Sequence, residues 1–157
     1  MMREILFRGQ IRRKGQKVWM DGSPVDSKWV EGYGVLMGKG DFSVIYAGSS
    51  VEKFPVYTDT VGQFTGFTDM NGKKIFEGDI VESRFTKRPY LVCFGEYTYV
   101  GGYEEEENAC GWYIEDENGY ASTIGCPDAW ATVIGNIHDN PEFLNVVCPY
   151  GERREGE

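Results

Sequence analysis

The sequence has little from which a reactive or metal-binding site could be built. It contains a single histidine, and its four cysteines stand far apart with no C-x-x-C pair: His138, Cys93, Cys110, Cys126 and Cys148. Zinc sites use paired ligands at short spacing, so the sequence predicts no metal site. In a chain that is not exported, separated cysteines are typical of free, buried thiols, and we expect that state here.

Long apolar runs, helical patterns and cofactor motifs are also missing. No run approaches the roughly 20 apolar residues needed to cross a bilayer, and residues 1–8 lack the apolar stretch of a signal peptide. We therefore expect a cytoplasmic protein that does not contact a membrane. No G-x-x-x-x-G-K, dinucleotide-binding or G-x-S-x-G pattern occurs, so no cofactor-binding or catalytic residues are predicted.

The chain is instead rich in aromatic residues (15%) and in glycine (21 residues), a composition typical of an all-β protein. Tight turns are predicted at Asn71-Gly72 and Asn118-Gly119. One helical turn is predicted at 140–144, with Asn140 as its cap. Strands are predicted at 5–7, 28–37 (with a bulge or close contact), 42–47, 63–67, 74–76, 80–82, 90–100 (with a possible bulge at Gly95), 112–114, 120–124 and 130–137. The expected core includes Phe64, Phe67 and Phe76.

Charge is distributed unevenly along the chain. Residues 1–50 carry +3, residues 51–100 carry −1 and residues 101–157 carry −11, for a total of −9. This acidity opposes nonspecific binding to nucleic acid. The acidic run 104–107 is interpreted as a solvated loop rather than a cation site, because four adjacent glutamates lack the spacing of a calcium loop.

One basic segment is the best candidate for a nucleic-acid contact, because cations meet phosphate and an aromatic ring stacks on a base. The favoured alternative is a solvated loop that offsets the acidic third of the chain, within one chain or between subunits. The segment contains Arg8, Arg12, Arg13, Lys14 and Lys17, with Trp19 nearby.

Three residues are candidates for acid–base chemistry, namely Glu77, Asp79 and His138. Glu77 and Asp79 are two residues apart, so in an extended segment they point to the same side. Asp before a strand more often accepts backbone N–H groups in a turn, and the same interpretation is favoured for His138, which follows a strand. No further residue marks a reactive site.

The residues from Thr60 to Gly66, with Asp69, 71–73 and 75–81, resemble the YopX family of phage and prophage proteins. The blocks 3–9, 29–33 and 133–142 support the resemblance, which reaches from the first residues to about Leu144. The segments 10–26, 104–107 and the tail after Asn145 depart from the family pattern.

The resemblance implies an irregular N-terminal β lobe (1–70) and a small SH3-like barrel (71–145). Residues 146–157, beyond the resemblance, are expected to form a flexible tail. It also implies a multimeric protein of a mobile element, in a bacterial host cell, and it supplies no catalytic residues to carry over. Three functions follow in order of preference. The first is a non-enzymatic homo-oligomeric assembly or interaction protein. The second is a nucleic-acid-binding accessory protein using residues 8–17, and the third is an enzyme using Glu77, Asp79 or His138.

Overall fold

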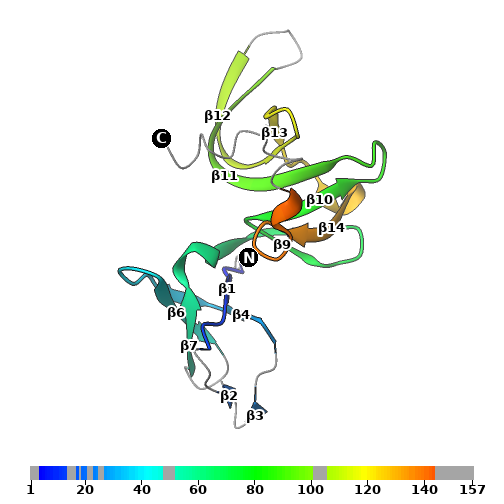
Figure 1. The fold of residues 1–157 in the computed structure, drawn as a ribbon. Helices are drawn as coiled ribbons and strands as arrows, with labels where there is room; N and C mark the ends of the chain where they lie inside the picture. The colour runs from blue at the N-terminus through cyan, green and yellow to red at the C-terminus, as the bar shows by residue number, and fades with distance from the viewer. Residues whose placement is uncertain are drawn as a thin grey trace. The chain divides into compact units, whose positions relative to one another are not determined.

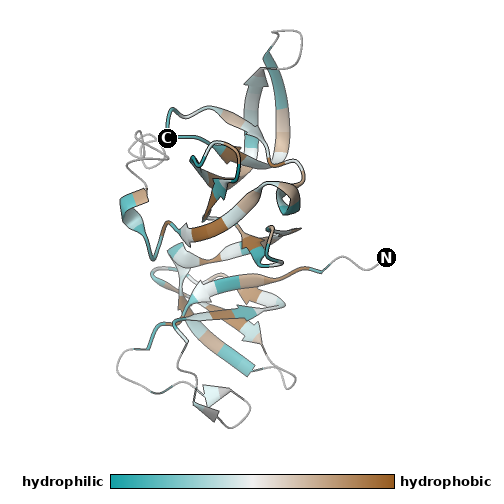
Figure 2. Cartoon of the chain, turned by 90° about the vertical axis from the view of Figure 1, so that its right-hand side faces the viewer, coloured by the Kyte–Doolittle hydropathy of each residue, from teal (hydrophilic) through white to brown (hydrophobic). Residues whose placement is uncertain are grey.

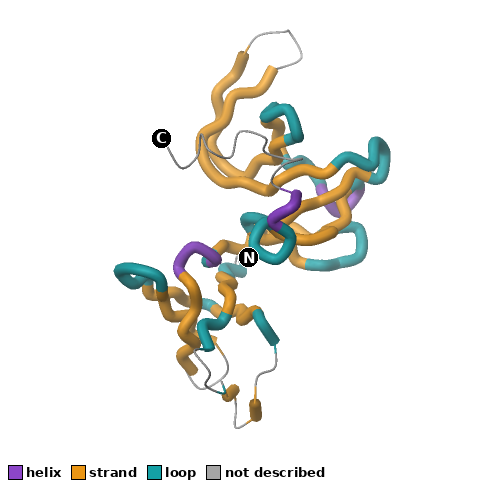
Figure 3. The backbone as a smooth tube through the Cα atoms, in the orientation of Figure 1, coloured by secondary structure: helices purple, strands orange, loops and turns teal. Residues whose placement is uncertain are grey.

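The computed structural model describes residues 4–13, 17, 19–20, 23–24, 27–47, 52–100 and 106–143. Within them the protein is mainly β, as predicted: every strand pairing is antiparallel, and the only helical elements are three short 3-10 turns (Figure 3). The chain divides into two compact units, residues 1–66 and 67–157. The domain boundaries expected from the sequence remain a prediction, and the tail 146–157 lies outside the described residues.

The first unit contains two small sheets and a short ribbon (Figure 1). In one sheet, β1 (Phe7–Gln10) pairs with β4 (Trp29–Gly32) and with β8 (Gly62–Thr68), whose last residues belong to the second unit. The other sheet has the order β5 (Gly34–Leu36), β6 (Phe42–Ala47), β7 (Glu52–Tyr57). The ribbon pairs β2 (Trp19–Met20) with β3 (Ser23–Pro24). A 3-10 turn, η1 (Thr58–Thr60), leads from β7 to β8.

The core of the first unit lies where β6 and β7 face β1 and β4. Alternate residues along β6 and β7 are buried, and they pack with Ile11 and Val30. A single bridge between Ile11 and Val56 joins the end of β1 to β7. The buried cluster is Ile11, Val30, Ile45, Ala47, Phe54 and Val56. Burial of each Val, Ile or Phe side chain contributes roughly 1.5–3 kcal/mol to the stability of the folded state.

Two predictions for this unit need correction. The strand predicted at 28–37 is two strands, β4 and β5, which are separated at Tyr33. At Tyr33 the chain changes its pairing partner. The backbone N–H of Tyr33 donates to the carbonyl oxygen of Tyr46 (3.0 Å), so β4 pairs with β1 and β5, which follows, pairs with β6. The opening strand begins at Phe7, not Ile5, whose side chain is exposed. The sequence also predicts a loop at Gly48-Ser49-Ser50, and these residues lie outside the described ones.

The second unit is built around a five-stranded sheet with the order β13-β12-β11-β10-β14. The short strand β9 (Lys74–Phe76) lies next to β8, at the edge of the sheet that β8 forms with β1 and β4. Two 3-10 turns, η2 (Pro127–Ala129) and η3 (Pro141–Phe143), precede and follow β14, and η3 occupies the predicted helical turn. The sheet strands are β10 (Asp79–Ser83), β11 (Pro89–Val100), β12 (Glu106–Glu115), β13 (Ala121–Thr123) and β14 (Ala131–Asn136).

Both faces of this sheet are buried near its centre. Val81 and Val92 belong to one cluster, with Ile75, Ile114, Ile124 and Ala131, whereas their neighbours Ile80 and Leu91 belong to another with Cys93. Because successive side chains of a strand point to opposite faces, the two clusters lie on opposite sides of the sheet. Figure 2 shows brown hydrophobic segments along these central strands. The sheet is open, because β13 and β14 form its two edges, so closure into the expected SH3-like barrel is not confirmed.

The predicted core phenylalanines divide into two groups. Phe64 and Phe76 are buried, as predicted, but Phe67 is 36% exposed, so that prediction is wrong. Phe67 lies in β8 beside Gly66, also exposed, where the alternation of inward and outward residues breaks. The burial pattern of β8 has two consecutive buried residues, Phe64 and Thr65, and then two exposed ones.

Candidate interaction surface

The most prominent feature of the second unit is the long hairpin of β11 and β12 (Figure 1). Its strands pair without interruption from Leu91 opposite Glu115 to Val100 opposite Glu106. The sequence predicts β11, but of the second strand it predicts only residues 112–114. The run 106–111 was missed because it begins with glutamates and an asparagine, which have low strand propensity.

Two glycines form one cross-strand pair within this hairpin. Gly95 lies opposite Gly111, and their φ angles are +144° and +149°, which side-chain-bearing residues rarely adopt. The predicted bulge at Gly95 is wrong, since the register is unbroken there. Tyr97 and Tyr113 stack with ring centroids 4.7 Å apart, one on each side of the pair along the hairpin. The two tyrosines therefore contact each other across the glycine pair.

Side chains of the outer hairpin combine aromatic and acidic groups. Phe94 and Trp112, directly opposite each other, contact edge to face at 4.8 Å, yet Phe94 remains 57% exposed. An open depression of about 600 Å³ lies along the neighbouring pairs, lined by Glu96, Tyr97, Thr98, Asn108, Ala109 and Cys110. An exposed ring beside carboxylates and amides suits contact with a protein surface better than enclosure of a small molecule.

The acidic run contributes to this hairpin. Glu106 and Glu107 are exposed residues of β12, so the prediction of a loop is wrong for them, and 104–105 lie outside the described residues. The hydroxyl of Tyr99 donates to Glu107 Oε2 (2.7 Å). That hydrogen bond, together with the negative charge of Glu107, raises the pKa of Tyr99 above its ordinary value. The Tyr99 hydroxyl therefore stays a donor over a wider pH range.

The turn that holds the predicted carboxylate pair is a structural one. Asp79 is buried, and its Oδ2 accepts the backbone N–H of Phe76 at 2.8 Å. His138 lies beside this turn: its Nε2 is 3.8 Å from the position that a Cβ on Gly78 would take. The backbone N–H of His138 donates to Asn136 Oδ1 (3.0 Å). The structure thus brings the three candidate residues into one region, but a buried Asp79 offers no carboxylate to a substrate.

A second buried carboxylate of this unit, that of Asp69, was not among the candidate residues predicted from the sequence. Asp69 is buried; its Oδ1 accepts backbone N–H groups from Asn71 and Lys73, and its Oδ2 accepts that of Val133. Burial raises the pKa of Asp69, but the three backbone donors together outweigh it, so the pKa lies below its ordinary value. The predicted Asn71-Gly72 turn is confirmed, and Asp69 ties it to β14.

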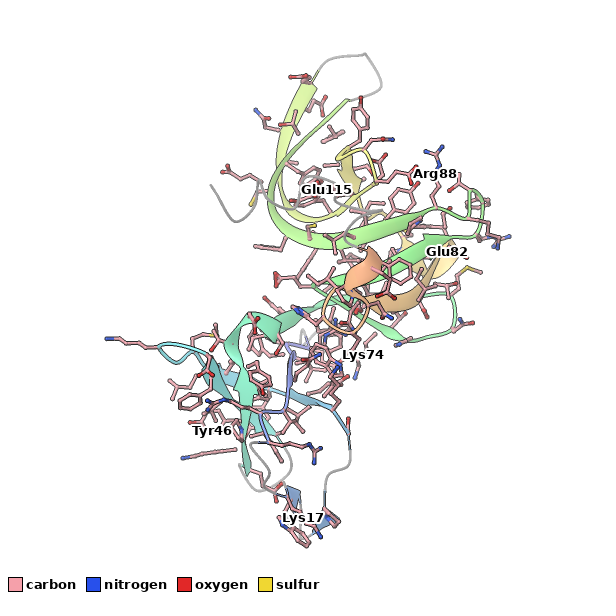
Figure 4. All side chains as sticks on the ribbon, in the orientation of Figure 1. Lys17, Tyr46, Lys74, Glu82, Arg88 and Glu115 are labelled. Atoms are coloured by element: carbon pink, nitrogen blue, oxygen red, sulfur yellow. The ribbon has the colours of Figure 1, made fainter. Side chains whose placement is uncertain are left out.

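The basic segment is folded against its own unit. Arg12 pairs with Asp41 (3.0 Å), and its guanidinium lies over the ring of Phe42. Arg13 donates to the carbonyl oxygen of Ser27, and Arg8, a residue of β1, lies over the ring of Trp29. The prediction of a solvated loop is wrong for Arg8, and the acid that meets Arg12 lies in the N-terminal unit. Lys17 (Figure 4) and Trp19 are exposed, and Lys14 lies outside the described residues.

The described cysteines are free, but their burial differs from the prediction. Cys93 is buried in the sheet, whereas Cys110 on the hairpin and Cys126 before η2 are exposed. Cys148 lies outside the described residues. Within the described part of the chain, no three His, Cys, Asp or Glu side chains gather as a metal site, and no helix there is long and apolar enough to span a membrane.

Comparison with known protein families identifies this chain by its sequence. The sequence model of a family described as YopX protein matches residues 27–145. The match begins after the segment 10–26 and ends before the tail, two of the three regions that depart from the family pattern. No curated protein matches the chain.

Proposed function

Because the chain belongs to the YopX family, we propose that it acts as a non-enzymatic accessory protein of a phage or prophage, assembling with copies of itself in the host cytoplasm. The observation that carries this proposal is the amount of apolar surface left exposed. Among the described residues, Phe85 is 73% exposed, Leu36 60% and Phe94 57%. Side chains of this kind on both units favour a partner surface.

The burial of Asp69 and Asp79 supports a non-enzymatic role. Asp79 and Asp69 are the two buried carboxylates of the described region, and each accepts backbone N–H groups that hold a turn. A general base must reach a substrate proton, and neither group is accessible for that. A broad hydrolase screen that detects activity lost in His138→Ala would contradict this part of the proposal.

The finer fold proposed for the second unit is an SH3-like barrel. Two features support it: the first and last strands of the sheet, β10 and β14, are neighbours, and a 3-10 turn, η2, precedes the last strand. A bulge between β10 and β14, where Ile134 has no partner, bends the sheet as a small barrel requires. An experimental structure with β13 remote from β14 in all copies would refute it.

Nucleic-acid binding through residues 8–17 is the weaker candidate. Arg12 and Arg13 already bind Asp41 and the Ser27 carbonyl, so using them for phosphate requires breaking those contacts. Lys17 and Trp19 are exposed, so a phosphate and a base could reach them. Binding to single-stranded oligonucleotides at low salt, weakened strongly by Arg12→Glu with Arg13→Glu, would favour this function over assembly.

The first test is the mass of the untagged protein in solution. Size-exclusion chromatography with light scattering is expected to give a defined multiple of 17.8 kDa and a protein absorbance spectrum without a 260 nm excess. A monodisperse monomer at micromolar concentration would refute the assembly function.

A further inference from the structure

The second surface of interest is the outer face of the β5–β6–β7 sheet. The inward residues of β6 and β7 (Ser43, Ile45, Ala47, Phe54 and Val56) are buried, so the intervening residues face the other way. These are largely apolar and lie in cross-strand rows, Leu36–Val44–Pro55 and Phe42–Tyr57. We call Leu36, Phe42, Val44, Tyr46, Pro55 and Tyr57 the outer face.

The outer face has no cover of its own in the described part of the chain. Leu36 is 60% exposed, Phe42 42% and Tyr57 39%, and the adjacent Met37 is 57% exposed. A sheet normally presents polar residues on a solvated side. A continuous apolar row in their place indicates a surface that a partner covers.

Cations surround the outer face. The Arg12 guanidinium lies 5.3 Å from the centroid of the Phe42 ring, and the Lys53 ammonium lies 5.8 Å from that of Tyr46, which projects from β6 (Figure 4). Lys39 is exposed in the turn between β5 and β6. Arg12 has a carboxylate beside it, that of Asp41. The outer face is therefore apolar with a basic edge.

The complementary surface is on the chain itself. Residues 1–66 carry nine Lys or Arg and seven Asp or Glu, a net charge of +2, whereas residues 67–157 carry seven and eighteen, a net charge of −11. Exposed acids of the second unit lie on the β11–β12 hairpin, where Glu96 and Glu106 are on the same face as Phe94. An apolar surface with a basic edge and a hairpin with an exposed ring among acids match in both polarity and charge.

We propose that the β11–β12 hairpin of one copy docks on the outer face of the β5–β6–β7 sheet of a second copy, with Phe94 as the apolar anchor and the hairpin glutamates facing Lys39 and Lys53. The inference rests on the proposed self-assembly and names the surfaces that produce it. The two surfaces differ, so each copy in the interior of an assembly uses both, and the contact is head to tail. Such contacts build a ring when the rotation closes and an open chain when it does not.

Two blocking variants test this contact. Leu36→Asp places a charge in the middle of the outer face and repels the acidic hairpin, and Phe94→Asp removes the anchor. Each variant alone is expected to elute as a monomer of 17.8 kDa. Mixed in equal amounts, they retain one intact outer face and one intact hairpin between them. The mixture is therefore expected to form a dimer containing one copy of each variant, which cannot grow.

Controls separate a lost contact from a lost fold. Tyr120→Asp changes an aromatic residue that is 73% exposed and belongs to neither surface, so the mass of this variant must equal that of the wild type. Tyr57→Asp is a second blocking variant of the outer face. All variants are compared with the wild type by circular dichroism and thermal unfolding before their masses are interpreted.

The outcomes distinguish this inference from the function beneath it. A monomeric wild type refutes self-assembly itself. A multimeric wild type whose mass is unchanged in Leu36→Asp, Tyr57→Asp and Phe94→Asp leaves self-assembly standing and overturns the proposed contact. Blocked variants that stay monomeric when mixed also overturn it. If Leu36→Asp instead removes a 260 nm absorbance while the mass of the protein assembly is unchanged, the outer face binds single-stranded nucleic acid and the inference is wrong.

Discussion

Asp69 provides the sharpest test of how the second unit is held together. Its two carboxylate oxygens accept three backbone N–H groups at 2.8–2.9 Å, from Asn71, Lys73 and Val133. In Asp69→Asn, the amide oxygen keeps the first two partners while the NH₂ group faces the N–H of Val133, so one acceptor becomes a donor. Losing one hydrogen bond to a charged group costs about 1.5–3 kcal/mol.

We therefore expect Asp69→Asn to lower the free energy of unfolding at pH 7 by about 2–3 kcal/mol, measured by urea denaturation. Asp128→Asn is the matched control, because Asp128 lies in η2 of the same unit with an exposed side chain. Its free energy of unfolding should stay within about 0.5 kcal/mol of the wild type. If Asp69→Asn lowers the free energy of unfolding no more than Asp128→Asn does, the hydrogen bonds of Asp69 do not stabilise the second unit.

The pH dependence gives an independent check. The pKa of Asp69 is lower in the folded protein than its ordinary value, so the unfolded chain binds more protons at this site. Its stabilising contribution is complete above the unfolded pKa of about 3.9 and is lost as pH falls through the lower folded pKa. The difference in free energy of unfolding between the wild type and Asp69→Asn should therefore shrink as the pH falls from 5 to 2. A difference that stays constant over this range would contradict the expectation.

Three further predictions test other parts of the fold. Gly111→Ala should lower the free energy of unfolding by about 1–3 kcal/mol because of its φ of +149°. Gly34→Ala should cost less, because Gly34 has an ordinary φ and a Cβ there would make only ordinary van der Waals contact with Tyr46; equal urea midpoints would contradict this. Gly135→Ala would place a Cβ against Asn140 Oδ1, so it should lower the free energy of unfolding. Asn140→Gly in the double variant should recover part of that loss; simple additivity of the two changes would refute this clash. The buried thiol of Cys93 should react with a thiol reagent only in urea, as peptide mass mapping would show; rapid reaction of the native protein would mean that its burial is wrong.

Local patterns were sufficient for much of the strand content. The segments 42–47 and 74–76 were predicted with the bounds that β6 and β9 have, because each is a short β-branched or aromatic run next to turn residues. The turn at Asn71-Gly72 was likewise predictable from two residues that tolerate positive φ. The family could also be identified from the sequence, because identities gather in the short window around Thr60–Gly66.

Other features depended on residues far apart in the chain. The Asp69 network reaches Val133, and the conformation of Gly95 is matched by that of Gly111 across the hairpin. β7 was missed entirely: its sequence EKFPVY contains a proline and two charges, and only pairing with β6 makes it a strand. The hairpin surface could not be predicted because its β12 half begins with glutamates.

The amino-acid sequence by itself determined the β-rich class, the family, most strand positions and the uneven distribution of charge, since these depend on composition and on residues adjacent in the chain. Only the tertiary structure decided which apolar side chains are buried. Phe64 and Phe67 look equivalent in sequence, yet one is core and the other exposed, and of the three described cysteines only Cys93 is buried. Burial depends on which face of a strand meets another element, and that is set by long-range pairing that local chemistry does not encode.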